Sequence, residues 1–205
     1  MSKLLLATSN KGKVREYQQL FHDLPLEMVT LLDMGINAVV TEEYVTYEEN
    51  ARHKAVSYAG ISNLITLADD SGLEVDVLGG EPGVLSARYA GEDASDSDRV
   101  NLLLSRITGV PWEKRTAQFK CVIALAIPGG NAVTFYGDCK GLVALAPRGK
   151  YGFGYDPIFF FPELDKTMAE LSPEVKNSIS HRARAAQKAH KTLARLLTEG
   201  KAWLN

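Results

Sequence analysis

Two adjacent carboxylates, Asp69 and Asp70, follow the apolar run Leu64–Ala68 and precede Ser71 and Gly72. The run predicts a short buried strand, and ligands of open α/β sheets gather at the carboxyl ends of strands. Adjacent carboxylates repel each other, so we expect a cation beside them, and Mg²⁺ suits a site near phosphate because it takes one or two carboxylates. One of the pair could also orient or deprotonate a water molecule. A plain Asp-Ser-Gly turn is the alternative.

A polar turn near the start of the chain is a second candidate. Its residues are Thr8, Ser9, Asn10, Lys11, Gly12 and Lys13. The run Lys3–Thr8 predicts a strand, and apolar residues at spacings of three and four after the turn, from Val14 onward, predict an amphipathic helix. A strand-to-helix turn presents unpaired backbone N–H groups and the positive end of the helix dipole, which suits a phosphate. The glycine spacing differs from that of a Walker A loop, and an exposed polar turn is the alternative.

A third candidate lies on a helix that a capping-box pattern begins at Thr46. Asn50 and Lys54 are four residues apart, so they share a face of this helix. Gly60 stands where a helix stop is expected. A lone lysine is usually a solvated surface residue, so Lys54 gains weight only from its neighbours.

Two later segments could recognise a flat base. The first is Gly152, Phe153, Gly154, Tyr155, Asp156 and Pro157, and the second is Lys176 through Arg182. Phe153 could stack on a base and Asp156 could accept hydrogen bonds from its edge, although an aromatic residue packed in a tight turn is the alternative. Ser180, His181 and Arg182 place three hydrogen-bonding side chains at the start of the last helix.

The elements that must position these groups belong to a globular chain of 205 residues with 45% apolar and 23% charged residues. The net charge of −2 calls for neither nucleic acid nor an anionic membrane. No window approaches the roughly 18 consecutive apolar residues of a membrane span. Cys121 and Cys139 lie in apolar runs, and two buried reduced thiols of a cytoplasmic protein are favoured over a disulfide between neighbouring strands.

Strands that alternate with helical crossovers and a hairpin predict an α/β protein with a mixed sheet. Pro128-Gly129-Gly130-Asn131 marks the hairpin. The chain contains no Pro/Ser-rich linker, which indicates a single domain over residues 1–205. The expected strands are Lys3–Thr8, Leu26–Leu32, Leu64–Ala68, Phe119–Ile127, Ala132–Tyr136, Gly141–Ala146 and Pro157–Phe161, and the last helix begins at about Ser180.

Six motifs in order resemble one family. They are Ser-Asn-Lys-Gly-Lys, Thr-Tyr-Glu-Glu-Asn-Ala, Ala-Asp-Asp-Ser-Gly-Leu, Gly-Gly-Glu-Pro-Gly-Val-Leu-Ser-Ala-Arg-Tyr-Ala-Gly, Phe-Gly-Tyr-Asp-Pro-Ile-Phe and Ser-His-Arg. Each is weak alone, but together they span residues 3 to about 190 and resemble the inosine/xanthosine triphosphate pyrophosphatases, house-cleaning enzymes of the Ham1/RdgB type. The resemblance implies a long mixed sheet with flanking helices in two lobes around a central cleft. It also implies a homodimer.

The resemblance further implies Mg²⁺-dependent hydrolysis of ITP, dITP and XTP, which are purine nucleoside triphosphates, between the α and β phosphates. Asp70 would be the general base and a metal ligand with Asp69 beside it, and Lys54 would assist catalysis. Thr8 through Lys13 would hold the triphosphate, and Ser71 would contact the substrate. The base pocket would contain Phe153, Gly154, Tyr155, Asp156, Lys176, His181 and Arg182.

One region departs from the family pattern, because many members read Glu-Glu-Thr-Gly where this chain has Thr41-Glu42-Glu43-Tyr44. Alignment on Thr46 makes Glu42 the expected metal carboxylate, with Glu43 as the alternative. For the base, donors from the Arg182 side chain or from the His181-Arg182 backbone would pair with a 6-oxo group and clash with the amino group of adenine.

Three other functions remain open. The enzyme could prefer another base, such as a modified pyrimidine, or the chain could sense nucleotides without turnover. The carboxylate pair weighs against a pure binder, which has little need of a base beside the phosphates. An RNA-binding protein that uses the basic last helix is disfavoured by the pI of 6.1.

Overall fold

The computed structural model describes residues 2–199. Its contacts divide the chain into two compact units, which are treated separately below. The first unit contains Met1–Asp70, Cys121–Gly137 and Arg182–Asn205, and the second contains Ser71–Lys120 and Asp138–His181. The interpretation of residues 1–205 as a single domain with a central cleft stays a prediction.

Five α-helices and seven strands make up the regular structure of the described residues, together with several short 3₁₀ turns. The helices are α1 (Lys11–Leu20), α2 (Tyr47–Ser62), α3 (Asp96–Arg106), α4 (Pro173–Ile179) and α5 (His181–Glu199). The strands are β1 (Ser2–Leu6), β2 (Leu26–Thr30), β3 (Ile65–Val75), β4 (Thr116–Ala126), β5 (Ala132–Val143), β6 (Phe159–Phe161) and β7 (Lys166–Thr167).

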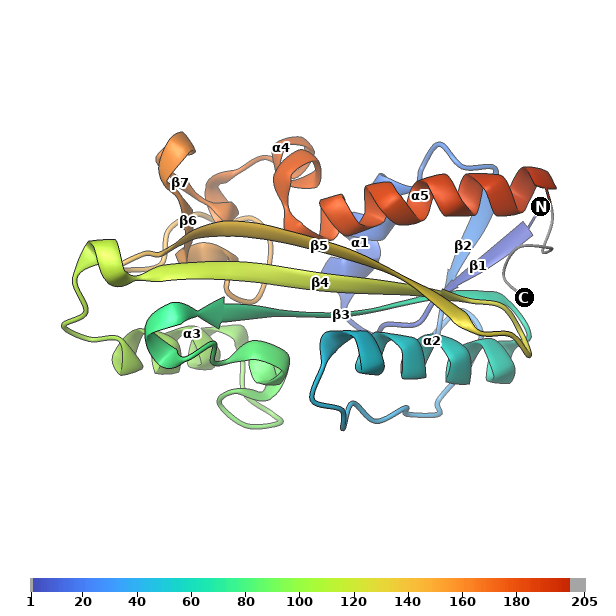
Figure 1. Ribbon diagram of the computed structural model, residues 1–205, viewed down its shortest axis with the longest axis horizontal. Helices are drawn as coiled ribbons and strands as arrows, with labels where there is room; N and C mark the ends of the chain where they lie inside the picture. Colours follow the sequence, from blue (N-terminus) through green and yellow to red (C-terminus); the bar gives the residue numbers. More distant parts are fainter. Residues whose placement is uncertain (1, 200–205) are drawn as a thin grey trace. The chain divides into compact units, whose positions relative to one another are not determined.

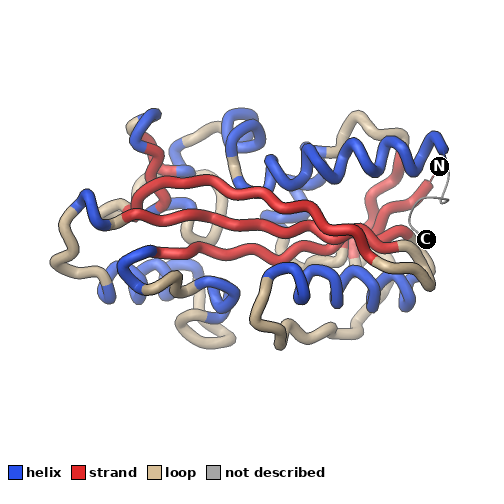
Figure 2. The backbone as a smooth tube through the Cα atoms, viewed as in Figure 1, coloured by secondary structure: helices blue, strands red, loops and turns tan. Residues whose placement is uncertain are grey.

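The strands form a mixed sheet with the order β2-β1-β3-β4-β5-β6-β7. β1 pairs in parallel with β2 and β3, whereas β6 pairs antiparallel with β5 and β7. β4 and β5 are neighbours, so the predicted hairpin is confirmed. The predicted α/β class, with a mixed sheet and flanking helices, is confirmed as well (Figures 1 and 2).

The first unit buries an apolar layer between its strands and the pair α1 and α5. Tyr17 and Phe21 of α1 share this cluster with Ala189 and Leu193 of α5 and with Leu4 of β1. Full burial of a side chain the size of leucine or phenylalanine stabilises the folded state by about 1.5–3 kcal/mol. α2 covers the other face of these strands (Figure 1).

The second unit has a core of its own that is rich in aromatic residues. Phe119 of β4 lies 4.7 Å from Phe159 of β6, measured between ring centroids, and Phe159 meets Phe161 edge to face at 5.2 Å. Leu103 and Ile107 at the end of α3 complete this cluster. The core fixes the chain on both sides of residues 152–156.

Two sequence predictions of element ends were wrong. β3 does not stop at Ala68 but continues to Val75, so Asp69 and Asp70 lie inside a strand and not in a turn. α2 passes through Gly60 to Ser62, and Asn63 ends it with a left-handed backbone, φ 55°. Asparagine tolerates this conformation better than other residues with a side chain, so it replaces the expected glycine.

Candidate active site

The two carboxylates of β3 point to opposite faces of the sheet. Successive residues of a strand alternate between its faces, and the partners follow this rule. Asp69 meets Lys13 of α1, whereas Asp70 meets Asn50 of α2. The two carboxylates therefore have different hydrogen-bond partners, although the charges of Lys13 and Lys54 act on both, and a metal ion shared by the pair stays a prediction.

Asp69 is a buried carboxylate surrounded by cations. Its side chain is 1% exposed, with Lys13 Nζ 2.9 Å and Arg182 Nε 3.6 Å from Oδ2. Burial alone would raise the pKa of Asp69, but the charges of Lys13, Arg182 and Lys54 outweigh it and lower the pKa to about 2. Asp69 therefore stays ionised and holds Lys13 in place at the start of α1.

Arg182 lies behind this pair. Its side chain is 2% exposed, and its guanidinium donates to Glu16 Oε2 at 2.7 Å. The guanidinium also lies over the ring of Tyr17, 5.9 Å from the centroid. Its guanidinium thus pairs with two carboxylates of the first unit, and the expected role of this side chain as a donor to the base stays a prediction.

Asp70 occupies an environment that suits a general base. Asn50 Nδ2 donates to its Oδ2 at 3.0 Å. Burial and the nearby charge of Glu42 raise the pKa of Asp70, and the ammonium of Lys54 opposes them in part. A raised pKa makes a carboxylate a stronger base while it remains ionised near neutral pH.

Lys54 joins the acidic groups on this face. Its ammonium pairs with Glu42 and donates to the main-chain oxygen of Asp69. Burial would lower the pKa of Lys54, but the carboxylates of Glu42, Asp69 and Asp70 outweigh it and raise the pKa. Glu42 is half-buried beside Lys54 and Glu43 is exposed, so the structure brings Glu42 into the cluster.

The polar turn is built differently from the expectation. Asn10 Oδ1 accepts from the backbone N–H groups of Gly12 and Lys13, at 2.8 and 3.1 Å, and so caps α1. These two groups are therefore not unpaired. Thr8 Oγ1 accepts from Asn10 N at 3.2 Å, which tightens the turn further. Ser9 and Lys11 have exposed side chains.

The second unit contains a compact polar group at residues 152–156. Asp156 pairs with Lys176, and its Oδ2 accepts from Phe153 N at 2.9 Å. The Lys176 ammonium lies 4.9 Å from the centroid of the half-exposed Phe153 ring. A Cβ on Gly152, where φ is +76°, would come within 2.0 Å of Asp156 Oδ2, so only glycine fits there.

The other expected residues of this unit are fixed by packing. His181 stacks on Phe119 with centroids 4.5 Å apart, and its Nδ1 lies 3.9 Å from Cys139 Sγ. Tyr155 donates to the oxygen of Ser86 at 3.1 Å, and burial raises its pKa. Gly154 N donates to Asp96 Oδ2 at 2.6 Å. Ser71, next to Asp70 on β3, is half-exposed.

The donors of the first unit fit a divalent cation at Asp70. Among residues 2–199, no three His, Cys, Asp or Glu side chains gather into a ready-made metal cage. Mg²⁺ needs no such cage, because it takes one or two carboxylates and completes its shell with water and phosphate oxygens. Glu42 and Asp70 are close enough for the charge of one to raise the pKa of the other. A divalent cation would relieve that repulsion.

A family model described as the Ham1 family matches residues 4–192. The chain belongs to the Ham1 family. It is 51% identical over 185 residues to the dITP/XTP pyrophosphatase of Geobacter sulfurreducens, and this alignment covers 90% of this chain and 93% of the relative. It is 46% identical over 193 residues to the protein of the same name from Bacillus subtilis, covering 94% and 98%.

Solved structures of the Ham1 family agree with the fold. A Ham1 protein of Coxiella burnetii has a TM-score of 0.85 and 38% identity, covering 95% of this chain and all of that one. The Staphylococcus aureus Ham1 protein has a TM-score of 0.82 and 41% identity, covering 94% and 98%.

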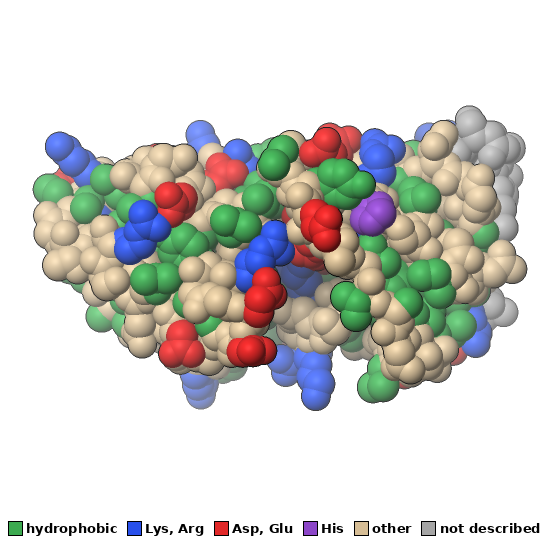
Figure 3. Space-filling model, turned by 90° about the horizontal axis from the view of Figure 1, so that it is seen from below, with side chains coloured by type: hydrophobic (Ala, Val, Ile, Leu, Met, Phe, Trp, Pro, Cys, Tyr) green, Lys and Arg blue, Asp and Glu red, His purple; other side chains and the backbone are tan. Residues whose placement is uncertain are grey.

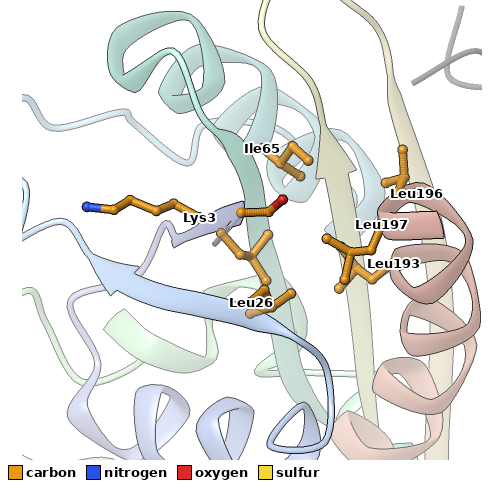
Figure 4. A pocket seen from close by; sticks show the side chains of 8 residues that line it. Lys3, Leu26, Ile65, Leu193, Leu196 and Leu197 are labelled. Carbon is orange, nitrogen blue, oxygen red and sulfur yellow. The ribbon is translucent and has the colours of Figure 1, made fainter. Parts of the chain in front are cut away.

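Other surfaces of this Ham1-family chain offer less chemistry. A small hollow is lined mainly by aliphatic side chains, and Lys3 extends away from its leucines (Figure 4). On the face in Figure 3, Lys and Arg side chains are interspersed with acidic and apolar ones.

No helix within residues 2–199 is long and apolar enough to cross a membrane. Both cysteines are buried and reduced, as predicted.

Two residues of the site escaped the sequence reasoning, and a third was underrated. Glu16 and Tyr17 face Arg182 from α1, but it lies 166 residues from Glu16 and no spacing links them. The sequence analysis treats Asn50 only as a neighbour of Lys54. Its position four residues before Lys54 places it on the same face of the helix, and this spacing was the available signal that Asn50 also belongs to the site.

Proposed function

We propose that this chain is a Mg²⁺-dependent nucleoside triphosphate pyrophosphatase that hydrolyses dITP, ITP and XTP to the monophosphate and pyrophosphate. The names of the relatives support the substrates and the reaction. The structural observation that carries the proposal is the group at Asp70, where a buried carboxylate with a raised pKa lies beside Lys54 and Glu42. The cluster combines a base, a cation and a further oxygen ligand.

Asp70 takes the proton from the attacking water in this mechanism. Its raised pKa makes the proton transfer more favourable than for an exposed aspartate. Asn50 Nδ2 donates to Oδ2, which fixes the orientation of the carboxylate for this proton transfer. Attack occurs at the α phosphorus, and pyrophosphate leaves.

Cationic side chains of the first unit offset the charge of the substrate. A triphosphate carries about four negative charges, and attack by water adds negative charge at the reacting phosphate. Lys54 contacts the groups next to Asp70, and Lys13 stands at the start of α1, held by Asp69. Asp69 is then a positioning residue for Lys13 and not a metal ligand.

Glu42 and Asp70 would hold the divalent cation. When bound there, Mg²⁺ would neutralise phosphate charge and lower the pKa of a coordinated water. Lys54 pairs with Glu42 and lies within reach of the charge of Asp70, so its ammonium would stand beside the phosphates of a substrate bound at these carboxylates.

We assign base recognition to residues 152–156 together with Lys176. The ring of Phe153 supplies a stacking face, and Lys176 and Asp156 supply a donor and an acceptor. Arg182 is assigned to hold Asp69 and not to read the base. Backbone donors at His181 and Arg182 remain the expected partners of a 6-oxo group. The homodimer that the resemblance implies and the cytoplasmic location that the reduced thiols favour are also part of the proposal, and sedimentation velocity measures the oligomeric state.

A substrate panel tests the proposed function. Turnover of dITP, ITP, XTP, GTP, ATP and dTTP is measured with and without Mg²⁺, and the products are identified. We expect monophosphate and pyrophosphate from the 6-oxo purines dITP, ITP and XTP, with a strong requirement for the metal. Faster turnover of a pyrimidine triphosphate would refute the substrate assignment, and tight ITP binding without products would favour a sensor.

Two matched variants test the residue roles. Asp70→Asn should lower kcat by about a thousandfold while ITP binding changes by less than about tenfold, because it removes the base more than the pocket. Glu42→Gln should raise the Mg²⁺ concentration needed for half-maximal turnover, whereas Glu43→Gln at the exposed neighbour should not. Equal effects of the two glutamate variants would contradict the assignment of the metal to Glu42.

A further inference from the structure

The loop before α2 lies along this helix and is bound to it at regular intervals (Figures 1 and 2). Asn50 holds both backbone groups of Tyr44, accepting from its N–H at 3.0 Å and donating to its oxygen at 3.1 Å. One helical turn later, Lys54 pairs with Glu42. These contacts tie a loop without regular secondary structure to one face of the helix.

The third contact is made by Tyr58, one further turn along α2. Its hydroxyl accepts from Val40 N at 3.3 Å and donates to the oxygen of Ala38 at 2.9 Å. Asn50, Lys54 and Tyr58 are four residues apart, so they form one stripe on the helix. We call this stripe the polar ladder.

The ladder matches the repeat of an extended chain. Four residues of helix advance about 6 Å, and two residues of extended chain advance about 6.6 Å. The loop runs antiparallel to the helix, and even-numbered residues meet the ladder. Val40 and Glu42 are partly buried, whereas Val39, Thr41 and Glu43 are exposed; Ala38 and Tyr44 are exposed as well, and they meet the ladder through backbone groups. A shift of one residue would put Thr41 or Glu43 opposite Lys54.

We propose that the polar ladder sets the register of residues 38–44 and thereby delivers the Glu42 carboxylate to the metal site at Asp70. Asn50 and Tyr58 are positioning residues for the reaction: Asn50 acts on both Asp70 and the loop, and Tyr58 acts through the loop alone. The inference rests on the proposed function in one respect, namely that Glu42 and Asp70 hold the divalent cation.

Tyr58→Phe is the decisive variant, because it removes one oxygen and keeps the ring. Amide hydrogen exchange of residues 38–44 measures the register without any metal or substrate. We expect the Val40 amide to exchange about fivefold to tenfold faster, as for loss of one hydrogen bond. Tyr47→Phe removes a hydroxyl from the same helix outside the ladder and should leave this exchange unchanged.

Metal binding is then measured on the free protein by titration with Mn²⁺ followed by electron paramagnetic resonance. If the variant loop is in register only about a third of the time, the apparent affinity falls about threefold. The Mg²⁺ concentration for half-maximal turnover should rise by the same factor, with a smaller change of kcat at saturating Mg²⁺. A purely structural loss of stability would not produce this split.

Asn50→Ser provides a second, independent variant, with exchange of the Tyr44 amide as its readout. Unchanged exchange in both variants would overturn the ladder, and faster exchange with unchanged Mn²⁺ affinity would overturn its role at the metal site. Wild-type protein that turns over no nucleotide would refute the proposed function instead. In that case the exchange and Mn²⁺ measurements alone decide the inference.

Discussion

Replacement of Asp69 by asparagine tests the electrostatic network that holds Lys13. The carboxylate is 1% exposed and its pKa falls from the usual 3.8 to about 2. That difference corresponds to about 2 kcal/mol of free energy of unfolding at neutral pH, since each tenfold change in an ionisation constant is worth 1.36 kcal/mol. The loss in Asp69→Asn should be at least this large, because Lys13 and Arg182 lose a buried partner.

The pH dependence of this loss has a definite sign. A carboxylate whose pKa is lowered by folding stabilises the native state above its unfolded pKa, and the stabilisation is lost as the pH falls toward the folded pKa. For Asp69 the window runs from about 3.8 down to about 2. The difference in stability between wild type and Asp69→Asn should therefore shrink by about 1 kcal/mol between pH 5 and pH 3.

Urea unfolding of wild type and variant at pH 7, 5 and 3 measures both quantities. Asp93→Asn, at an exposed carboxylate, is the control and should change stability by less than about 0.5 kcal/mol. The reasoning is refuted if Asp69→Asn is as stable as wild type at pH 7. It is equally refuted if the difference between them is the same at pH 5 and pH 3.

Three further predictions follow from the same contacts. Because burial raises the pKa of Asp70 and the Asn50 hydrogen bond lowers it, NMR titration of the metal-free protein should find the Asp70 carboxyl titrating above the usual aspartate value, and at still higher pH in Asn50→Ser; a titration that stays in place would contradict this. Asn63→Gly should preserve or raise the melting temperature and Asn63→Ala should cost about 1 kcal/mol, because position 63 has a left-handed backbone; equal stability of the two variants would argue against strain. A thiol reagent should modify Cys121 and Cys139 only on unfolding, because both are buried and burial raises the pKa of Cys121 to about 12; rapid labelling of native protein would disprove it.

Local patterns predicted most elements of the fold. The capping pattern at Thr46 and the Pro-Gly-Gly-Asn hairpin depend on residues close in sequence, and both were found in the structure. The helix end at Asn63 was missed, because a left-handed asparagine carries a weaker signal than glycine. The short elements β7 and α4 were also missed, since two to seven residues give too little periodicity.

Which residues form the site stays a prediction, but part of their arrangement can be compared with the sequence. Lys13 of the first turn and the Asp69-Asp70 pair were both expected near the phosphates, and Lys13 does pair with Asp69. The sequence could not show that Asn10 caps α1 or that Arg182 is buried against Glu16, because both depend on side-chain geometry and on contacts between distant segments. Whether a polar side chain serves a ligand or the fold is decided by such partners.

Because Asp69 and Asp70 point to opposite faces of the sheet, the register between β1 and β3 decides the surroundings of each carboxylate. β1 and β3 are aligned with Leu4 opposite Ile65 and Leu6 opposite Leu67. A slip of β3 by a single position would exchange its two sides, and the residue meant to accept a proton would then lie among permanent cations that suppress its basicity. The leucines that fix this alignment therefore also determine which of the two carboxylates has the raised pKa.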